Sequence, residues 1–592
     1  MIFGKHINRY YLKYGPILLL GIIALLAVDF FQLEIPELYE MVIAGATNGF
    51  VIKDGVRHEF TLDFVLEEVL SPMIFIIIAM VIGRFLWRVC FFGSAIRVET
   101  EIRNKMFDHS KELSQSFYQK NKVGDLMSLY TNDLETINEC YGDGVLMFFD
   151  AALLGSMAVY KMAKMSLSLT LFSMIPMVFL LIVATVVGKY MMDKWEERQE
   201  AYSELSDFAQ ESFSGIAVIK AFVKETRELW RFKKINRKNE DVNVSYTRAS
   251  TLMHIFVTLF VESVICIILG YGGYLVYIGK DGFTASRLIE FISYFMAVVW
   301  PIMAVSSLIE MTSRGRASMK RISNLLDEEI DVKDKEGVYE VENIDGNIEF
   351  RNLTFRYPDA DYDALSDVSF KINAGENVGI IGKTGAGKTT IVDLILRTYN
   401  VPSGTVFIDG HDVNRIPIKT VRKFSAYVPQ DNFLFSDTIE NNICFASDSP
   451  DSAGAVEAAI LADVDSNISE FPEKYKTVLG ERGVTVSGGQ KQRISIARAL
   501  MKDAKILILD DSVSAVDTKT EKVILDNLKR TRKGKTTILI AHRVSTLENM
   551  DKIIFIEDGK ILAVGSHEEL YRASAEYRKT VELQRLEENK AD

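Results

Sequence analysis

The sequence has few cysteines and no excess of positive charge. Its four cysteines, Cys90, Cys140, Cys266 and Cys444, are scattered without paired spacing, which argues against a disulfide framework and against a metal cluster. Asp and Glu outnumber Lys and Arg, 80 to 68, so the formal net charge is -12. Because nucleic-acid binding depends on an excess of Lys and Arg, we expect no nucleic-acid partner. No small-residue cleavage site follows residues 1–14, which argues against a cleavable signal peptide.

Apolar residues are abundant and gather in the first half of the chain. A chain of 592 residues is too long for one core, so we expect at least two domains. Several apolar runs approach the ~20 residues that a helix needs to cross a bilayer. We therefore predict an all-helical membrane domain, residues 1–325, with six spans. The spans are predicted at residues 15–44, 69–92, 145–161, 167–187, 251–278 and 288–309.

Basic residues mark one end of these spans. Lys5, Arg9 and Lys13 precede the first span, and further Lys and Arg residues follow the second, fourth and sixth. By the positive-inside rule these ends face the cytoplasm. The connection at residues 45–68 is acidic on balance and should face outside.

Two connections on the cytoplasmic side are too long to be turns. Residues 97–144 and 189–250 contain no proline and carry apolar residues at helical spacing, so we expect the helices to continue beyond the bilayer. Glycine interrupts the helical pattern near residues 114–124 and 210–216. From the pattern alone, each break could equally be an ordinary solvent-exposed interruption of a helix or a segment that contacts another part of the protein.

Composition changes near residue 326. Residues 326–345 are highly charged and lack periodicity, which is typical of a linker. Residues 347–355 and 364–372 alternate as strands do. Strands and helices then alternate to the end, as expected for a parallel sheet with helices on both faces. We predict a second domain of the α/β class at residues 346–592.

The clearest chemical landmark is a glycine-rich loop between an apolar run and an amphipathic segment. Gly382, Gly387, Lys388 and Thr389 fit the phosphate-binding pattern G-x-x-x-x-G-K-[ST]. Glycines let the backbone approach a phosphate closely, and the helix that follows points its positive end at the same anion. We interpret the loop as an ATP site. Its expected ligand residues are Gly382, Lys383, Thr384, Gly385, Ala386, Gly387, Lys388, Thr389 and Thr390.

A second landmark is the apolar run at residues 506–509, which follows Lys505 and leads into Asp510 and Asp511. Four consecutive apolar residues suit a strand buried on both faces. The acid at its carboxyl end, Asp510, is placed to meet Mg²⁺ beside the phosphate loop. The Thr389 hydroxyl is the other expected protein ligand of that ion.

With these landmarks the chain resembles an ATP-binding cassette half-transporter of the multidrug or lipid exporter type, over essentially its whole length. Residues 486–493 resemble the family signature, although Val486 replaces the more usual leucine. In the family, the signature of one chain meets the nucleotide held by the phosphate loop of another, so the resemblance implies a dimer. The residues that would contact the partner's nucleotide are Ser487, Gly488, Gly489 and Gln490.

The resemblance also implies roles for single residues. Tyr357 matches the aromatic residue that stacks on adenine. Gln430 matches the residue that senses Mg²⁺ and the membrane domain, and is a candidate metal ligand and catalytic residue. His542 matches the catalytic switch histidine. Residues 514–517 match a dimer-contact loop.

Three further segments gain a meaning from the resemblance. Residues 480–483 resemble the exporter segment that contacts the cytoplasmic hairpins. The hairpin breaks near residues 115–122 and 212–219 are implied to be coupling helices, which dock on nucleotide-binding domains.

Asp511 departs from the family pattern, which has glutamate at this position to polarise the attacking water. Loss of one methylene draws the carboxylate back by ~1 Å, a misplacement that can cost about a hundredfold in rate. We therefore expect a site that binds ATP and hydrolyses it poorly. The same change resembles the impaired subunit of heterodimeric exporters, so we predict a heterodimer. A homodimer with slow turnover is the alternative, because aspartate can still act as a base.

The implied function is ATP-driven export of amphipathic or apolar compounds, such as a drug, a lipid or a peptide. We expect an integral protein of a bacterial inner or plasma membrane with its nucleotide-binding domain in the cytoplasm. The expected partners are a second half-transporter, the lipid bilayer and a small amphipathic substrate. An ATP-gated channel or regulatory subunit and a homodimeric lipid flippase are the alternatives.

Side chains within the spans leave two interpretations open. Glu262 lies mid-span, where an ionisable group is by default a functional candidate, although bonding between helices is nearly as frequent. Phe291, Tyr294, Phe295 and Trp300 share helical spacing in the sixth span. They could line a cavity for apolar compounds, but packing between spans is the commoner explanation.

Overall fold

The computed structural model describes residues 4–591, apart from residues 54, 280–281, 448–450, 481–482, 484–485 and 515. Parts of the predicted segments 480–483 and 514–517 lie outside the described residues. The chain divides into two compact units. The first comprises Met1–Ser110 and Gly124–Asp327, and the second comprises Lys111–Val123 and Glu328–Asp592. The stretch near residue 115 therefore belongs to the second unit.

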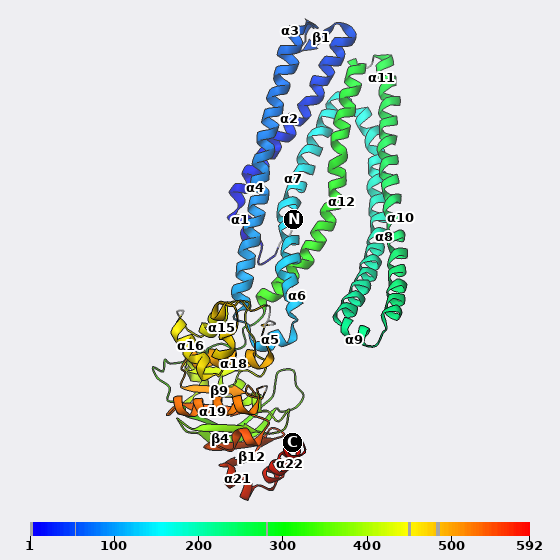
Figure 1. Ribbon diagram of the computed structural model, residues 1–592. Coiled ribbons are helices and arrows are strands. Elements are labelled where there is room, and N and C mark those ends of the chain that lie inside the picture. The colour runs from blue at the N-terminus through cyan, green and yellow to red at the C-terminus, as the bar shows by residue number, and fades with distance from the viewer. Residues whose placement is uncertain are drawn as a thin grey trace. The chain divides into compact units, whose positions relative to one another are not determined.

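The first unit consists of long helices (Figure 1). Its helices are α1 (Asn8–Lys13), α2 (Gly15–Asn48), α3 (Leu62–Phe64), α4 (Ser71–Ser110), α6 (Val123–Ser128), α7 (Leu134–Met165), α8 (Leu167–Ser214), α9 (Ile216–Ala221), α10 (Glu225–Ile267), α11 (Gly273–Ile278) and α12 (Ala285–Asp327). Three π-helical turns, Val65–Leu70, Ile268–Gly272 and Leu129–Asp133, continue neighbouring helices. A small antiparallel hairpin of β1 (Phe50–Lys53) and β2 (Val56–Glu59) joins α2 to α3.

Five continuous helical stretches have the length and apolar composition to cross a membrane. They are Gly15–Asn48, Leu62–Ser110, Val123–Met165, Glu225–Ile278 and Ala285–Asp327. Each contains one predicted span. The remaining prediction, residues 167–187, falls in α8, whose described apolar part is the shorter stretch Leu167–Phe179. Five of the six predicted spans are thus confirmed, and the count of six stays a prediction.

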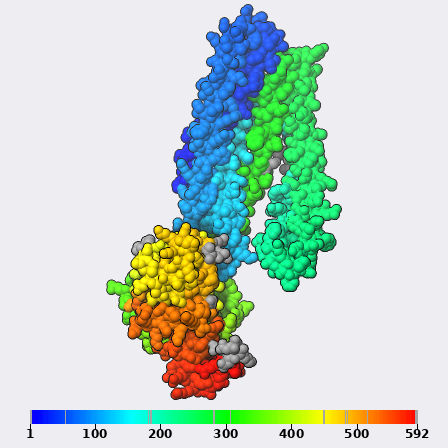
Figure 2. Space-filling model, viewed as in Figure 1, coloured from blue at the N-terminus to red at the C-terminus, as the bar shows by residue number. Residues whose placement is uncertain are grey.

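The helices extend well beyond the apolar stretches, as their patterns predicted. α8 and α10 pack against each other along their length and are joined by the short helix α9 (Figure 1). In the space-filling view the α9 end of this hairpin stands apart from the other helices of the first unit (Figure 2). Gly215 separates α8 from α9, so the predicted break is present, although the short helix covers 216–221 and not 212–219.

The break near residue 115 has a different cause from the one predicted. Ser114 and Asn121 adopt extended backbone and bound α5 (Gln115–Lys120). Gly124 lies inside α6 and does not interrupt it. Polar residues that accept extended backbone, and not glycine, delimit this short helix.

Packing explains most of the aromatic stripe in α12. Phe291, Tyr294 and Phe295 are buried in one apolar cluster with side chains of α2, α7, α8 and α10. Trp300 is half exposed and donates its indole N–H to Asp150 at 2.8 Å. Glu262 is exposed on α10.

The second unit is an α/β structure with two sheets. Its strands are β3 (Ile348–Phe355), β4 (Leu365–Ile372), β5 (Asn377–Ile381), β6 (Val406–Ile408), β7 (His411–Asp412), β8 (Ser425–Val428), β9 (Ile506–Asp510), β10 (Thr536–Ile540), β11 (Lys552–Glu557) and β12 (Lys560–Gly565). Its helices are α5, α13 (Lys388–Ile395), α14 (Ile418–Lys423), α15 (Ile439–Cys444), α16 (Ser452–Leu461), α17 (Asp465–Ser469), α18 (Gly488–Met501), α19 (Thr518–Thr531), α20 (Val544–Leu547), α21 (His567–Ala573) and α22 (Ala575–Ala591). Short 3-10 turns occur at Val413–Arg415 and Lys474–Lys476.

The larger sheet has the order β12-β11-β5-β10-β9-β8, and only the edge pair β11–β12 is antiparallel. The predicted parallel sheet is therefore present. The predicted strands β3 and β4 do not join it, because they pair antiparallel in a second sheet of order β4-β3-β6-β7. Their connection contains no helix, whereas parallel neighbours need a crossover of a dozen or more residues.

The strand order brings four loops to one edge. β5, β10, β9 and β8 are adjacent and parallel, so their carboxyl ends line up, and ligand sites of open α/β sheets form at that edge. These four ends lead into the phosphate loop, His542, Asp511 and Gln430, respectively.

Candidate functional site

The phosphate loop has the backbone that its glycines predict. It connects β5 to α13, and Gly387 immediately before α13 has a φ of 96°, in the left-handed region. A Cβ atom on Gly387 would lie 2.8 Å from the Ala364 carbonyl oxygen, and one on Gly382 would lie 2.1 Å from that of Ile556. Neither position can carry a side chain without displacing main chain.

Lys388 lies folded against the loop that precedes it. Its Nζ donates to the carbonyl oxygens of Gly382 and Lys383, both at 2.9 Å. Burial lowers the pKa of the Lys388 amine, while the carboxylates of Asp510 and Asp511 oppose that shift. The amine is thus held at the rim of the loop, where a polyphosphate can replace two carbonyls as its partner.

Asp510 and Thr389 form a pair that fits Mg²⁺. Asp510 ends β9, is 2% exposed, and its Oδ2 has no hydrogen-bond partner among the described residues. Burial raises the pKa of Asp510, and the nearby Thr389 hydroxyl opposes that shift. An orphaned buried carboxylate oxygen beside a hydroxyl supplies the hard oxygen ligands that Mg²⁺ takes together with phosphate oxygens.

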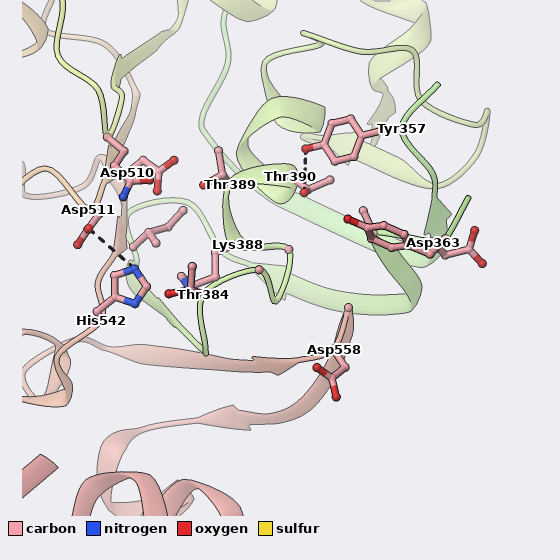
Figure 3. A pocket seen from close by; sticks show the side chains of 17 residues that line it. Tyr357, Asp363, Thr384, Lys388, Thr389, Thr390, Asp510, Asp511, His542 and Asp558 are labelled. Carbon is pink, nitrogen blue, oxygen red and sulfur yellow. Dashed lines mark hydrogen bonds and ion pairs between the residues drawn. The ribbon is translucent and has the colours of Figure 1, made fainter. Parts of the chain in front are cut away.

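Asp511 follows at the same strand end and faces His542 (Figure 3). The Asp511 backbone is fixed: its N–H donates to the Ile540 carbonyl at 3.0 Å, and its carbonyl accepts from Gln492 Nε2 at 3.2 Å and Ser514 Oγ at 2.8 Å. Its φ is 47°, a region where aspartate is tolerated better than most residues.

The Asp511 side chain is less firmly held than its backbone. Its Oδ2 lies 3.9 Å from His542 Nε2, beyond hydrogen-bond distance. Its Oδ1 is buried without a hydrogen-bond partner among the described residues. The carboxylate and the imidazole therefore lie within ion-pair distance of each other but share no hydrogen bond.

Most predicted nucleotide residues line one pocket of about 520 Å³ (Figure 3). The predicted residues among its lining are Tyr357, Thr384, Gly385, Gly387, Lys388, Thr389, Thr390, Gln430, Asp510, Asp511 and His542. Gly382 and Lys383 contribute the carbonyls that hold Lys388, and Ala386 is a buried residue of the loop.

The predicted signature residues are not part of this pocket. Ser487 is the N-cap of α18, which begins at Gly488. The Ser487 hydroxyl accepts from the Gln490 N–H at 3.3 Å, and the Gln490 side chain accepts from the Ser487 N–H at 3.0 Å. Gly488 lines a separate hollow that also includes Gln430 and Asp511. Gly489 follows in the first turn of α18.

Comparison with known proteins agrees with this architecture. Residues 18–302 match the family described as "ABC transporter transmembrane region", and residues 365–514 match the family described as "ABC transporter". The probable multidrug resistance ABC transporter ATP-binding/permease protein YheI of Bacillus subtilis (strain 168) is 35% identical over 584 residues, which cover 98% of this chain and 97% of that protein. The chain belongs to the ABC transporter family.

Other ABC proteins are similar over nearly the same length. The multidrug resistance-like ATP-binding protein MdlA of Escherichia coli (strain K12) is 34% identical over 574 residues, covering 97% of this chain and 94% of that protein. The ATP-dependent lipid A-core flippase of Syntrophus aciditrophicus (strain SB) is 33% identical over 550 residues, covering 92% and 91%. A solved structure of a bacterial Atm1-family ABC exporter with ATP bound has a TM-score of 0.75 at 25% identity and covers 98% of both chains.

Several expectations are thereby confirmed. This ABC transporter is an integral membrane protein that couples ATP hydrolysis to transport, and its ATP-binding domain is cytoplasmic. The transmembrane region precedes the ATP-binding domain in the chain, as predicted.

Sequence reasoning missed some residues of the ABC domain's pocket. Tyr362 lines it from the same loop as Tyr357 and is 73% exposed. Tyr357 instead donates its hydroxyl to Thr390 Oγ1 at 2.9 Å, and burial raises the pKa of Tyr357 to about 12. A second aromatic residue five positions after Tyr357 was a signal that could have been used.

Gln584 gave no such signal. It lies on α22, and its side chain donates to the His542 carbonyl at 2.7 Å and accepts from the Val544 N–H at 2.8 Å. This amide therefore clamps the loop that carries His542. A polar residue on a terminal helix is ordinary in a sequence, and only the fold brings it here.

Proposed function

We propose that this chain is one half of a dimeric exporter that uses ATP to move amphipathic or apolar compounds out of the cytoplasm. The observation that carries the proposal is the separation of its two anion-binding elements. The phosphate loop lines the ATP pocket, whereas the Ser487–Gln490 segment lies outside it and presents the N-terminus of α18. A second ABC domain would complete each pocket with its own signature.

The hairpin of α8, α9 and α10 supports a dimer. Phe213, Phe222 and Val223, at or beside α9, are 69–79% exposed. Apolar side chains grouped at the tip of a long polar hairpin indicate a contact surface. We propose that this tip is a coupling element that docks on the ATP-binding domain of the other subunit.

The site's chemistry fits binding better than rapid hydrolysis. Thr389, Asp510 and Gln430 would hold Mg²⁺, which supplies neutralisation of charge on the phosphates. Asp511 would be the base, and His542 would orient the outer phosphate. The short Asp511 side chain leaves its carboxylate away from His542, which supports slow turnover at this site.

An impaired site supports a heterodimer in preference to a homodimer. The partner would carry a glutamate at the equivalent position, and the intact Ser487–Gln490 segment of this chain would complete the partner's active site. ATP binding would favour the closed dimer because ATP has a higher affinity for that state, and hydrolysis in the competent site would reset it.

The names of the relatives guide the choice of cargo. Two are called multidrug resistance proteins and one a lipid A-core flippase. The test is to purify this chain alone and with a second half-transporter, and to measure ATP-dependent uptake of ethidium and of a fluorescent lipid into inside-out vesicles. We expect uptake only with the pair. Fast ATP hydrolysis and uptake by this chain alone would refute the heterodimer.

A second candidate is an ATP-gated or regulatory ABC subunit, and the position of Asp511 is the observation that favours it. The vesicle experiment separates the two candidates. A pump accumulates the probe against its gradient, whereas a gated pathway only equilibrates it.

A further inference from the structure

The short helix α5 lies in the same compact unit as the ATP pocket. Two side-chain contacts join α5 to the ATP-binding domain. Tyr399 donates its hydroxyl to Gln119 Oε1 at 2.9 Å, and Lys120 Nζ lies 2.8 Å from the Asp359 carboxylate. Each contact thus joins one side chain of α5 to one side chain of the ATP-binding domain.

Both contacts lead to Tyr357. Asp359 follows Tyr357 by two residues in the same loop. The Tyr399 ring meets the Tyr357 ring edge to face, with centroids 5.0 Å apart, and Tyr399 is only 4% exposed. Phe355 contacts both rings in the same edge-on manner. In a close-packed aromatic cluster one ring cannot move without displacing its neighbours.

The opposite side of Tyr357 faces the pocket. Its hydroxyl reaches Thr390 in α13, and the ring lies at the end of the pocket away from Asp511 (Figure 3). Neither contact of α5 directly involves residues 382–390, the expected ligands of the phosphates. A change at α5 should therefore affect how the base is held and leave the phosphates unaffected.

We propose that Gln119 and Lys120 are positioning residues for the nucleotide base. Docked α5 holds Tyr399 and the Asp359 loop so that Tyr357 is presented to the base, and a bound base in turn favours docked α5. This inference rests on the proposed role of Tyr357 in base binding. Coupling between two sites is reciprocal, so loosening α5 weakens base binding by the same factor by which the base strengthens α5 docking.

Reciprocity makes nucleotide affinity a measure of this coupling without any transported substrate. The experiment measures dissociation constants of the full-length purified chain by calorimetry, with Mg²⁺ present, for two probes. ATP has a base and a triphosphate, whereas inorganic tripolyphosphate has only the part that the phosphate loop binds.

Tyr399→Phe removes the hydroxyl and keeps the buried ring, and Gln119→Ala removes its acceptor. We expect each variant to bind ATP about three- to tenfold more weakly, since one hydrogen bond is lost. The double variant should lose no more ATP affinity than the more strongly affected single variant, because both changes break the same hydrogen bond. Affinity for tripolyphosphate should stay unchanged in all three.

Lys120→Ala has a matched control in Lys122→Ala, on the same segment. Lys122 is exposed and has no ion pair among the contacts of the described residues. Lys120→Ala should weaken ATP binding by no more than about threefold, because its ion pair with Asp359 is exposed. Lys122→Ala should bind both probes as the unmodified chain does.

Two results would overturn the inference. ATP affinity could be unchanged in both Tyr399→Phe and Gln119→Ala, or both probes could weaken equally, which would indicate general damage to the domain. Failure of the unmodified chain to bind ATP would instead refute the proposed function. The two failures are therefore distinguishable.

Discussion

Replacing Asp511 with glutamate tests the geometry of the ATP site most directly. In the structure the Asp511 carboxylate stops 3.9 Å from His542 Nε2, and its other oxygen is buried without a hydrogen-bond partner among the described residues. One added methylene advances the carboxylate by ~1.3 Å. That advance brings it within the ~3.2 Å limit for hydrogen bonding, and equally toward a water attacking a bound phosphate.

The size of the effect follows from the distance. A misplacement of ~1 Å can cost about a hundredfold in rate. We expect Asp511→Glu to raise ATP turnover of the purified chain by about 10- to 100-fold, which corresponds to ~1.4–2.7 kcal/mol of activation free energy. ATP affinity should change little, because the phosphate loop and Lys388 are untouched.

The assay is phosphate release by the unmodified chain and by Asp511→Glu, Asp511→Asn and Lys388→Ala. Because residue 511 has a positive φ, thermal unfolding of the glutamate variant must be measured as a control for strain. Unchanged turnover with unchanged ATP affinity and an intact fold would show that the reach of the carboxylate does not limit the reaction. High turnover in the unmodified chain, lost in Asp511→Asn, would refute the heterodimer as well.

Three further predictions use side chains around the same pocket. Gln584→Ala removes the two hydrogen bonds that hold the His542 loop, and it should lower ATP turnover about 5- to 10-fold with an unchanged KM for ATP. As a control, Arg585→Ala on the same helix should leave turnover unchanged. Tyr362→Ala should weaken ATP binding about 3- to 10-fold and leave tripolyphosphate binding unchanged, since stacking on a base contributes ~1–3 kcal/mol. Burial raises the pKa of Asp393 to about 6 from an ordinary value near 3.8, and Asp510 adds to the shift. A carboxyl whose pKa is raised in the folded state stabilises the fold below about pH 4, and this contribution is lost as the pH rises through 6. Asp393→Asn should therefore raise the unfolding temperature of the nucleotide-free protein at pH 8, where the gain in unfolding free energy is on the order of 2 kcal/mol. At pH 4 the gain should be much smaller.

Each of these predictions has an outcome that contradicts it. A rise in KM with unchanged kcat in Gln584→Ala would place that residue in ATP binding and not in positioning His542. Equal loss of ATP and tripolyphosphate in Tyr362→Ala would argue against a contact with the base. A gain in stability of equal size at pH 4 and pH 8 in Asp393→Asn would show that ionisation of Asp393 is not its cause.

The sequence was sufficient wherever function depends on residues that are consecutive in the chain. A phosphate cradle needs backbone N–H groups, glycines and a lysine at fixed spacing, so Gly382 to Thr389 could be identified directly. A bilayer sets the length of an apolar helix, so five spans could be placed from composition. Strand β9 was readable because burial on both faces demands an unbroken apolar run.

Contacts between distant segments were decided only by the tertiary structure. The order β5-β10-β9-β8 brings Lys388, Asp511 and His542 to one edge, and no local pattern encodes that order. Pairing of β3 with β4, the clamp of Gln584 on the His542 loop, and the contact of Gln119 with Tyr399 depend on chain segments that are far apart or on turn geometry. The sequence determined which chemical groups are available, and packing decided which of them meet.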